Sequence, residues 1–383
     1  MKRNEYKILS VVINIMKEIS VIVPLYKGEK YIFNIVSMIE TNYLILIENN
    51  IDCDIELIFV NDYPEERNIK KIESEYISVK YVMLKQNIGI HGARVKGLKK
   101  AKGEYILFLD QDDTIRSEWM MSQLQIISDN GIVICNGKYR NGRYIYSSCL
   151  EQKLSMSRKN IERLKIISPG QALIKKKCIP KEWYHNILKH NGCDDYYLWL
   201  LMLSQGLNFA SNNSVLYIHN ESGTNQSFNW KEMLASKKEV LRKYKKSVYV
   251  KKDIVICLKT MLSKTIEKYK VFMFYDQILQ ENLNIYTTYR KEIIIYGMGI
   301  YGLKLLRLLK RNHVKIVCTI DKDANLMNYD DVKVHLPDEK LPNADIMVVT
   351  AEFAFKEIQE KYENYIKVMK MSDFLREFNK RYF

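Results

Sequence analysis

A short apolar segment, Tyr105–Leu109, runs directly into the acids Asp110, Asp112 and Asp113, and this pattern sharply narrows the choice of folds. Five consecutive apolar residues are typical of a strand buried on both faces, as in a parallel sheet covered by helices. The acids would then lie at the carboxyl edge of that sheet, where open α/β sheets bind their ligands. The segment therefore predicts an α/β fold with a ligand site at this edge.

The three acids also indicate a chemistry. Like charges this close repel one another unless a cation or a set of hydrogen-bond donors compensates them. Their hard oxygen atoms suit Mg²⁺ or Mn²⁺ better than zinc. An acidic turn that caps the next helix, with Asp113 or Thr114 as N-cap, explains the same residues without a metal. The residues alone leave both interpretations open.

Four more segments place polar residues or glycines at the end of a predicted strand or the start of a predicted helix: Ile19–Tyr26, Ile55–Asp62, Gln86–Gly97 and Asn191–Leu201. In this order they resemble the family 2 glycosyltransferases, which have the GT-A fold. The resemblance covers residues 18–227. It implies an enzyme that transfers a sugar from a nucleotide-diphosphate donor to an acceptor hydroxyl.

The resemblance implies a donor site at these segments. Its nucleotide-sugar-binding residues would be Pro24, Tyr26, Asp62, Asn87, Gly89, Arg94 and Asp110. Asp62 matches the acid that accepts the uracil N3–H in this family, so the implied donor is a UDP-sugar. The segment departs from the family after that acid, where Asn61–Pro64 replaces the usual Asp-Asp-Gly-Ser. Val95 also stands where the family has a second asparagine.

The resemblance further implies a metal and a catalytic base. The metal, Mn²⁺ or Mg²⁺, would be held by Asp112, with further ligands from Asp110, Asp113 and His219. Asp195 would be the general base, and Asp194 stands where the family has glutamate. Helix N-capping by either acid is the structural alternative. Attack assisted by one carboxylate, without a covalent intermediate, implies inversion at the anomeric carbon.

Residues 231–270 carry a net charge of +9, out of +15 for the whole chain. Apolar residues recur there at helical spacing, which predicts helices with one buried face and one lysine-rich face. A solvated helical face, an anionic membrane surface and a phosphate-containing acceptor all fit this charge. No nucleic-acid recognition motif accompanies it, so nucleic acid is not an expected partner.

The last part of the chain has a second nucleotide-type signature. A strand predicted at Glu292–Tyr296 leads into a turn with Gly297, Gly299 and Gly302, and Asp321 follows a little over twenty residues later. This spacing is typical of a Rossmann fingerprint, in which the acid contacts a ribose hydroxyl. It predicts a small Rossmann-like domain over residues 291–383. Binding of a nucleotide or nucleotide sugar and a scaffold or dimerisation role are both open.

These observations predict four parts: an N-terminal extension (1–17), a GT-A catalytic domain (18–227), a basic helical connector (228–290) and the Rossmann-like domain (291–383). Seven scattered cysteines without a Cys-x-x-Cys pair indicate reduced thiols and a cytoplasmic protein, with peripheral attachment to the inner face of the membrane as an option. No apolar run reaches the roughly 20 residues of a membrane span.

The expected setting is bacterial surface polysaccharide or glycoconjugate synthesis, with a glycan or lipid-linked acceptor. Two alternatives stand beside a transferase. A sugar nucleotidyltransferase shares the metal-binding acids, but it should have a glycine-rich loop after its first strand, which Pro24–Gly28 does not provide. A nucleotide-sugar sensor without catalytic activity would keep Asp62 and Asp112 and would need no base.

Overall fold

The computed structural model describes residues 16–66, 68–127, 130–140, 142, 144–145, 153–154, 167–220, 229–280, 291–322, 328–329 and 331–379. Most of the predicted N-terminal extension, residues 1–15, lies outside the described residues. The chain divides into two compact units between Leu262 and Ser263. Among the described helices, none combines the length and the apolar character needed to cross a lipid bilayer.

The first unit is built on a mixed sheet of nine described strands in the order β3-β2-β1-β4-β8-β6-β9-β5, with β7 paired to β9. Strands β3, β2, β1 and β4 are mutually parallel, and β8 pairs antiparallel with β4. The strands are β1 (Lys17–Leu25), β2 (Cys53–Asn61), β3 (Ser78–Met83), β4 (Tyr105–Phe108), β5 (Thr114–Ile115), β6 (Ile132–Tyr139), β7 (Lys153–Leu154), β8 (Ala172–Lys175) and β9 (Phe209–His219).

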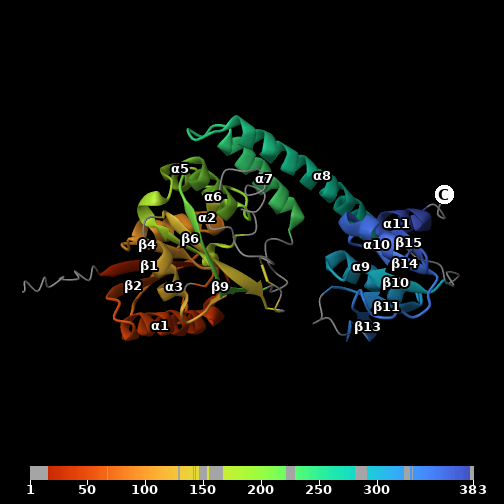
Figure 1. The fold of residues 1–383 in the computed structure, drawn as a ribbon, viewed down its shortest axis with the longest axis horizontal. Helices are drawn as coiled ribbons and strands as arrows, with labels where there is room; N and C mark the ends of the chain where they lie inside the picture. The colour runs from red at the N-terminus through yellow and green to blue at the C-terminus, as the bar shows by residue number, and fades with distance from the viewer. Residues whose placement is uncertain are drawn as a thin grey trace, which may run out of the picture. The chain divides into compact units, whose positions relative to one another are not determined.

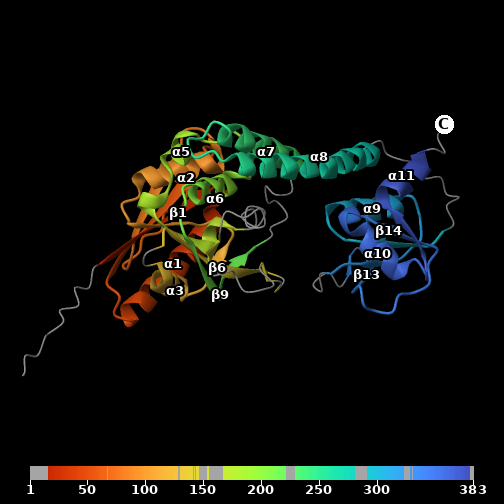
Figure 2. The ribbon, with the colours of Figure 1, turned by 45° about the horizontal axis from the view of Figure 1, so that its top comes forward.

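Helices cover both faces of this sheet (Figure 1). They are α1 (Ile32–Glu48), α2 (Gly89–Lys100), α3 (Trp119–Ile127), α5 (Lys181–His185), α6 (Asp194–Ser204), α7 (Trp230–Tyr244) and the first part of α8 (Lys252–Gln280). Side chains alternate along β1. Val21 and Val23 pack with α1 and α3, whereas Ile22 packs with α2 and α6 on the other face. Figure 2 shows the same layers after a 45° turn. Burial on both faces explains why these strands read as continuous apolar runs.

The parallel strands bring their carboxyl ends to one edge of the sheet. The N–H of Asp62, which follows β2, donates to the carbonyl oxygen of Leu25 at 2.8 Å. Similarly, the N–H of Leu109, which follows β4, donates to the carbonyl oxygen of Ile22 at 3.0 Å. Pro24, Asp62 and Asp110 therefore lie at the carboxyl ends of β1 and of its two neighbours, β2 and β4.

The second unit contains a separate sheet in the order β12-β13-β11-β10-β14-β15. Five of its strands are parallel, and their order is 3-2-1-4-5 when they are numbered along the chain, which is the order of a doubly wound sheet. Its strands and helices are β10 (Ile293–Tyr296), α9 (Ile300–Arg311), β11 (Ile316–Ile320), β12 (Asn328–Tyr329), β13 (Val332–His335), β14 (Ile346–Val349), α10 (Phe355–Tyr362), β15 (Lys367–Lys370) and α11 (Met371–Asn379).

The two faces of this second sheet are covered by different helices. Helices α9 and α11 pack on one face together with Tyr275 from α8. Helix α10 packs on the other face, where Ile358 and Tyr362 contact the apolar residues of β10 and β14. The first residues of α8 belong to the core of the first unit, and its later residues belong to the core of the second.

Candidate active site

A buried arginine joins two of the predicted site segments. Arg94 lies in α2 and is 3% exposed. One guanidinium nitrogen donates to Asp194 Oδ2 at 2.6 Å, at the start of α6, and the other donates to Asp110 Oδ1, just after β4. Charge-assisted pairs of this kind are strong and directional. Arg94 therefore fixes the start of α6 against the end of β4.

The two partner carboxylates respond differently to this arginine. Burial is the largest single influence and would raise the pKa of Asp194, but the charge of Arg94, the charge of His91 and the hydrogen bonds to the carboxylate together lower that pKa below its usual value. Burial raises the pKa of Asp110, and Arg94 only partly opposes this because the negative charge of Asp113 adds to it. Asp194 is thus held as an anion, while negative charge accumulates at the end of β4.

Asp195, the predicted base, follows Asp194 in the first turn of α6. Its Oδ1 accepts the N–H of Tyr196 at 2.6 Å. Burial, followed by the negative charge of Asp194, raises the pKa of Asp195 to about 7. Its side chain keeps partial exposure. A carboxylate in this state can accept a proton near neutral pH, which suits a general base.

Asp113 is the centre of a buried hydrogen-bond network. Its carboxylate accepts the hydroxyl of Tyr217 and the backbone N–H of Asn220, the latter at 2.9 Å. Nδ1 of His219 lies 3.0 Å from Asp113 Oδ1. Burial is the largest single influence and would lower the pKa of His219, but the hydrogen bond to Asp113 and the negative charges of Asp113, Asp110 and Asp112 together raise it. The network therefore ties the end of β9 to the turn after β4.

Asp112 lies in the turn after β4, between Asp110, which binds Arg94, and Asp113, the centre of the network. Burial and then the neighbouring charges of Asp113 and Asp110 raise the pKa of Asp112 to about 6. Within the described residues, no group of three or more His, Cys, Asp or Glu side chains is placed to hold a metal ion. A magnesium-type ion needs only one or two carboxylates when substrate phosphates supply further oxygens. The carboxylate of Asp112 fits that kind of site.

The residues predicted to bind the nucleotide surround Asp62. Oδ1 of Asp62 accepts the N–H of Ile88 at 2.7 Å, and burial raises the pKa of this carboxyl. Oδ1 of Asn87 accepts the N–H of Gly89 at 3.0 Å. Gly89 has a φ of +77°, and a Cβ there would lie 2.7 Å from Asn191 Oδ1. Only glycine therefore allows the chain to pass so close to the segment that precedes α6.

Tyr26 and Pro24 lie at the end of β1, beside the acids. The ring of Tyr26 meets that of Tyr63 edge to face, with centroids 5.1 Å apart, and the ammonium group of Lys27 lies 5.1 Å from the Tyr63 centroid. The backbone N–H of Tyr26 donates to Oε1 of Gln111 at 2.9 Å. The first unit thus brings all its predicted site residues to one region around the carboxyl ends of β1, β2 and β4.

Sequence reasoning missed several residues that hold this arrangement together. Gln111 joins β1 to β4, and its position between two predicted metal ligands was the available signal. Tyr217 lies two residues before His219 on β9, so strand alternation indicated a shared face. His91 shows no metal-ligand spacing in the sequence. It is buried, its Nδ1 accepts the N–H of Leu188, and burial lowers its pKa to about 4.

The second predicted site lies at the carboxyl edge of the sheet in the second unit. Gly297 has a φ of +95°, and its carbonyl oxygen accepts the hydroxyl of Thr350 at 2.6 Å. A Cβ on Gly302 would lie 2.0 Å from Gly297 O, so this turn needs glycine at both positions. Asp321 Oδ2 accepts the N–H of Met298 at 2.5 Å. Asp321 therefore holds the turn that precedes Gly299, the N-cap of α9.

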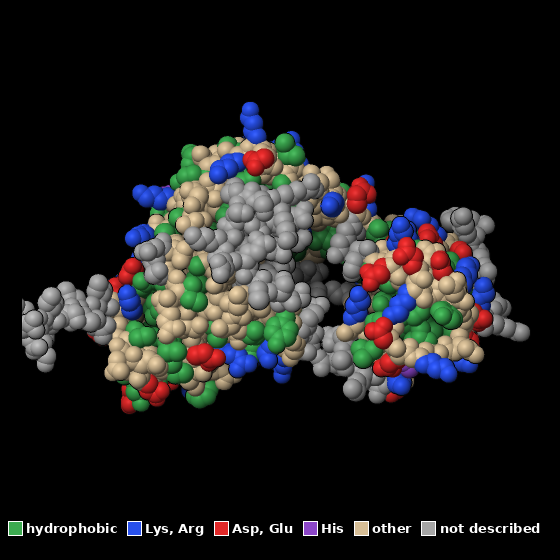
Figure 3. Space-filling view, in the orientation of Figure 1, with side chains coloured by type: hydrophobic (Ala, Val, Ile, Leu, Met, Phe, Trp, Pro, Cys, Tyr) green, Lys and Arg blue, Asp and Glu red, His purple; other side chains and the backbone are tan. Residues whose placement is uncertain are grey.

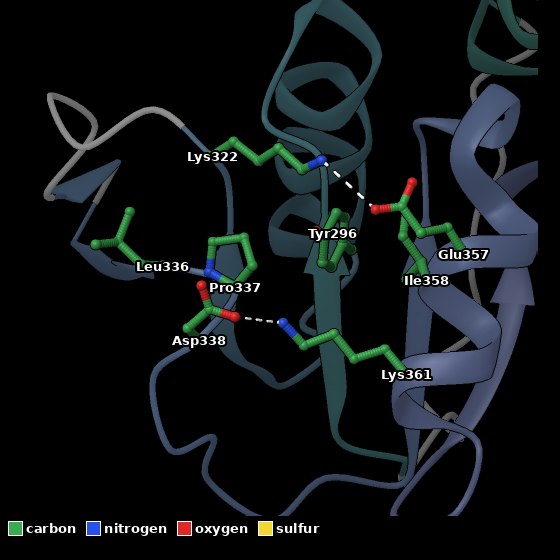
Figure 4. A pocket seen from close by; sticks show the side chains of 8 residues that line it. All are labelled: Tyr296, Lys322, Leu336, Pro337, Asp338, Glu357, Ile358 and Lys361. Carbon is green, nitrogen blue, oxygen red and sulfur yellow. Dashed lines mark hydrogen bonds and ion pairs between the residues drawn. The ribbon is translucent and has the colours of Figure 1, made fainter.

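A cavity of about 370 Å³ lies at the end of β10, where Tyr296 lines it (Figure 4). Its lining residues come from the ends of β10, β11 and β13 and from α10: Tyr296, Lys322, Leu336, Pro337, Asp338, Glu357, Ile358 and Lys361. Each lysine faces an acid, with Lys361 Nζ 2.6 Å from Asp338 Oδ1 and Lys322 Nζ 3.9 Å from Glu357 Oε1. The charges of this cavity are therefore balanced.

Comparison with known proteins places the first unit in a family. The model "Glycosyl transferase family 2" matches residues 20–169, and the model "C2185-like, N-terminal" matches residues 289–371. An uncharacterized glycosyltransferase of Haemophilus influenzae is 30% identical over 220 residues, which cover 54% of this chain and 78% of that protein.

Relatives from Gram-positive bacteria match shorter stretches. The minor teichoic acid biosynthesis protein GgaB of Bacillus subtilis is 40% identical over 26% of this chain, but the match spans 11% of GgaB. A crystal structure of Staphylococcus aureus TarS 1–349 in complex with UDP-GlcNAc has a TM-score of 0.49 at 16% identity, covering 67% of this chain and 73% of that one. Likeness at that level supports no statement about the ligand. The family match and the Haemophilus relative together show that the chain belongs to glycosyl transferase family 2 and is a glycosyltransferase.

Proposed function

We propose that this glycosyltransferase is metal-dependent and inverting, and that it transfers a sugar from a UDP-sugar to a hydroxyl group of an acceptor. The observation that carries the proposal is the environment of Asp195. Asp195 lies in the first turn of α6, next to Asp194, which Arg94 holds in place. The pKa of Asp195 is raised to about 7. A base with a pKa near the operating pH is the most effective one, and such a base contributes about 10²- to 10⁴-fold in rate.

In this reaction the carboxylate of Asp195 takes the proton of the acceptor hydroxyl. The hydroxyl oxygen attacks the anomeric carbon from the side opposite the diphosphate, and the bond between that carbon and the diphosphate oxygen breaks. The electron pair of that bond leaves with UDP, so the configuration inverts. Arg94 and Asp194 act as positioning residues, because they hold the start of α6 against the end of β4.

The donor would lie across the strand ends. We assign the uracil to Asp62, with Pro24 and Tyr26 forming the wall of the site next to it. We assign the ribose and the diphosphate to Asp110 and to the turn of Asn87 and Gly89. Mn²⁺ or Mg²⁺, when bound, would neutralise the diphosphate as a Lewis acid. Asp112 is the direct ligand we assign, with Asp110, Asp113 and His219 as further candidates. The raised pKa of Asp112 supports this, since a nearby cation would relieve the crowding of negative charge.

The acceptor belongs to bacterial surface glycan synthesis in this proposal. The names of GgaB and of the Staphylococcus aureus relative, poly(ribitol-phosphate) beta-N-acetylglucosaminyltransferase TarS, support that setting. The TarS match is 28% identical and spans 24% of TarS, so the acceptor of TarS is not transferred to this chain. A glycan or lipid-linked hydroxyl acceptor fits the reaction proposed here.

The test is nucleotide release from UDP-, GDP-, CDP- and dTDP-sugars with Mn²⁺, Mg²⁺ or EDTA, for the wild type, Asp112→Ala and Asp195→Asn. We expect slow hydrolysis of a UDP-sugar that needs the metal and both acids. A product with retained configuration would overturn the mechanism. Metal-dependent donor binding without turnover would favour a sensor, and release of pyrophosphate from UTP with a sugar phosphate would favour a nucleotidyltransferase.

A second candidate function concerns the cavity of the second unit. We propose that it takes the base and ribose of a nucleotide or nucleotide sugar, next to the turn of Gly297, Gly299 and Gly302. The supporting observation is that the cavity lies at the strand ends, lined by Tyr296, the last residue of β10 before the glycine turn, and by Lys322, which follows Asp321, as ligands lie in doubly wound sheets. Calorimetric titration of the full chain should reveal a binding event that persists in Asp62→Ala and is lost in Lys322→Glu. If Asp62→Ala shows no binding of any nucleotide or nucleotide sugar tested, a scaffold or dimerisation role is favoured.

A further inference from the structure

The turn between α7 and α8 combines exposed apolar side chains with a cluster of lysines. Its sequence over residues 245–252 is Lys-Lys-Ser-Val-Tyr-Val-Lys-Lys. Val248 is 83% exposed and Val250 is 44% exposed, and all four lysines are exposed as well. Ile256, one turn into α8, is 64% exposed. A single exposed valine would need no explanation, but apolar side chains grouped at the tip of a turn do.

The turn is held in place by hydrogen bonds, so the valines are presented by a built structure. The hydroxyl of Ser247 donates to Glu182 Oε2 at 2.7 Å, and the N–H of Tyr249 donates to the Ser247 hydroxyl at 3.0 Å. Tyr244, the last residue of α7, is fully buried and shares a hydrogen bond of 2.8 Å with Ser204. The fold therefore anchors both sides of the turn and leaves its tip outside the core.

The turn itself carries charge of one sign, although two acids lie beside it: Glu182 accepts the hydroxyl of Ser247, and Asp253 follows Lys252. Six basic residues and no acid occur between residues 242 and 252. In the space-filling view, hydrophobic side chains lie along the upper edge of the first unit together with Lys and Arg side chains, and acidic side chains are visible there too (Figure 3). A surface that complements this tip must be negatively charged and must also bury apolar side chains.

We propose that this turn docks on an anionic phospholipid surface, with Val248 and Val250 entering the headgroup region and the four lysines contacting the headgroups. Lysines near an anionic bilayer are attracted to its surface potential, and apolar side chains gain by leaving water at the same interface. A soluble polyanion, such as an anionic glycan or a nucleic acid, would use the lysines but would gain nothing from the valines. The valines therefore favour the membrane.

The docking turn lies away from the catalytic edge. Glu232, at the start of α7, accepts the N–H of Asn191 at 2.9 Å near the start of α6, whereas Tyr244 contacts Ser204 at the end of α6. The turn therefore follows the end of α7 opposite Asp195. Substitutions at its tip should leave donor turnover in solution unchanged, which separates a failure of this proposal from a failure of the proposed enzymatic reaction.

The test is flotation of the full chain with vesicles of phosphatidylcholine alone or with about 30% phosphatidylglycerol added. The anionic lipid gives the vesicles a negative surface potential. Lys245→Glu with Lys246→Glu should weaken partitioning by more than about 25-fold, since each lost lysine costs about fivefold. Lys340→Glu with Lys356→Glu is the matched control, because it makes the same change in net charge at exposed lysines of the second unit.

The apolar part is tested separately. Val248→Ser with Val250→Ser should weaken binding to anionic vesicles and leave binding to soluble heparin unchanged, while Phe33→Ser, at an exposed apolar residue of α1, should change neither. Three results would overturn the proposal: no binding of the wild type at low salt, equal binding of the tip and control variants, or valine substitutions without effect. The last result would identify a soluble polyanion as the partner.

Discussion

The two units both end their central strands in charged residues beside glycine turns, but they balance these charges differently. In the first unit, Asp110, Asp194 and Asp195 gather around the buried cation Arg94, and Asp112 lies beside Asp110 and Asp113. In the second unit, each lysine of the cavity faces its own acid. Uncompensated negative charge raises carboxyl pKa values and favours a cation, whereas paired charges do not. This difference supports our proposal that a metal and a general base act at the first edge, and it offers no such support at the second.

The largest effect should follow from removing the cation of the first unit. Arg94→Met leaves Asp110 and Asp194 without their buried partner, and breaking a buried pair costs about 3–5 kcal/mol. We expect the free energy of unfolding, measured by urea titration, to fall by that amount. Lowering the pH should recover part of the loss because the two acids then become neutral. Unchanged stability in Arg94→Met would remove the contrast between the two units.

The next effect concerns the base. Asp195→Asn should lower kcat by about 10²- to 10⁴-fold, because the amide cannot accept the proton. KM for the donor should change little, since Asp195 is assigned to the acceptor side. Asp253→Asn is the matched control, because Asp253 is an exposed acid in the first turn of α8. Equal activity of Asp195→Asn and the wild type would assign the base elsewhere.

A smaller effect is expected for the network around Asp113. Tyr217→Phe removes a buried hydroxyl that donates to a carboxylate, and hydrogen bonds to charged groups contribute about 1.5–3 kcal/mol. The free energy of unfolding should fall by that amount. Tyr365→Phe, at a residue that is 85% exposed, should leave it unchanged. If both variants behave alike, the network does not stabilise the turn after β4.

The pH dependence gives another test. The pKa of Asp195 is raised in the folded state, so folding favours the protonated form. The stability that this provides is complete below about pH 4, the pKa of an unfolded aspartate, and is lost as the pH rises towards about 7. Asp195→Asn should remove this loss and be more stable than the wild type at pH 8, by about 1–2 kcal/mol after allowance for solvent screening. Activity of the wild type should rise over the same range.

The smallest effect belongs to the second unit. Lys361→Met breaks the exposed pair with Asp338, and exposed ion pairs contribute little to stability. We expect no resolvable change in the urea midpoint. A loss as large as that of Arg94→Met would show that the charges of the cavity are as interdependent as those of the first edge.

The layout of the site could be predicted from the sequence. Parallel strands bring Pro24, Asp62 and Asp110 to one edge of the sheet, and this follows from the backbone alone, without knowledge of side-chain contacts. Glycine turns were equally visible, since Gly89 and Gly297 have positive φ values that few other residues adopt. The bridge from Arg94 to Asp110 and Asp194 was not visible. It depends on side-chain directions between segments up to 100 residues apart, and no periodicity encodes them.

The same limit applies to the predicted metal ligands. The spacing of Asp110, Asp112 and Asp113 does not reveal that Asp113 accepts hydrogen bonds from Tyr217 and Asn220. Only the tertiary pairing of β5 with β9 brings these groups together. The assignment of Asp112 and of the further ligands therefore stays a prediction.

The Arg94 bridge also sets an order for synthesis on the ribosome. Arg94 is made before either acid, and Asp194 follows 100 residues later. At about 5–20 residues per second, the nascent chain waits about 5–20 s for this second acid. Until then α2 cannot bury its arginine against both partners, so the strands can form while the donor edge stays open. The Arg94 bridge can thus be completed only after α6 has emerged, and the contacts of Asp113 with the end of β9 come later still.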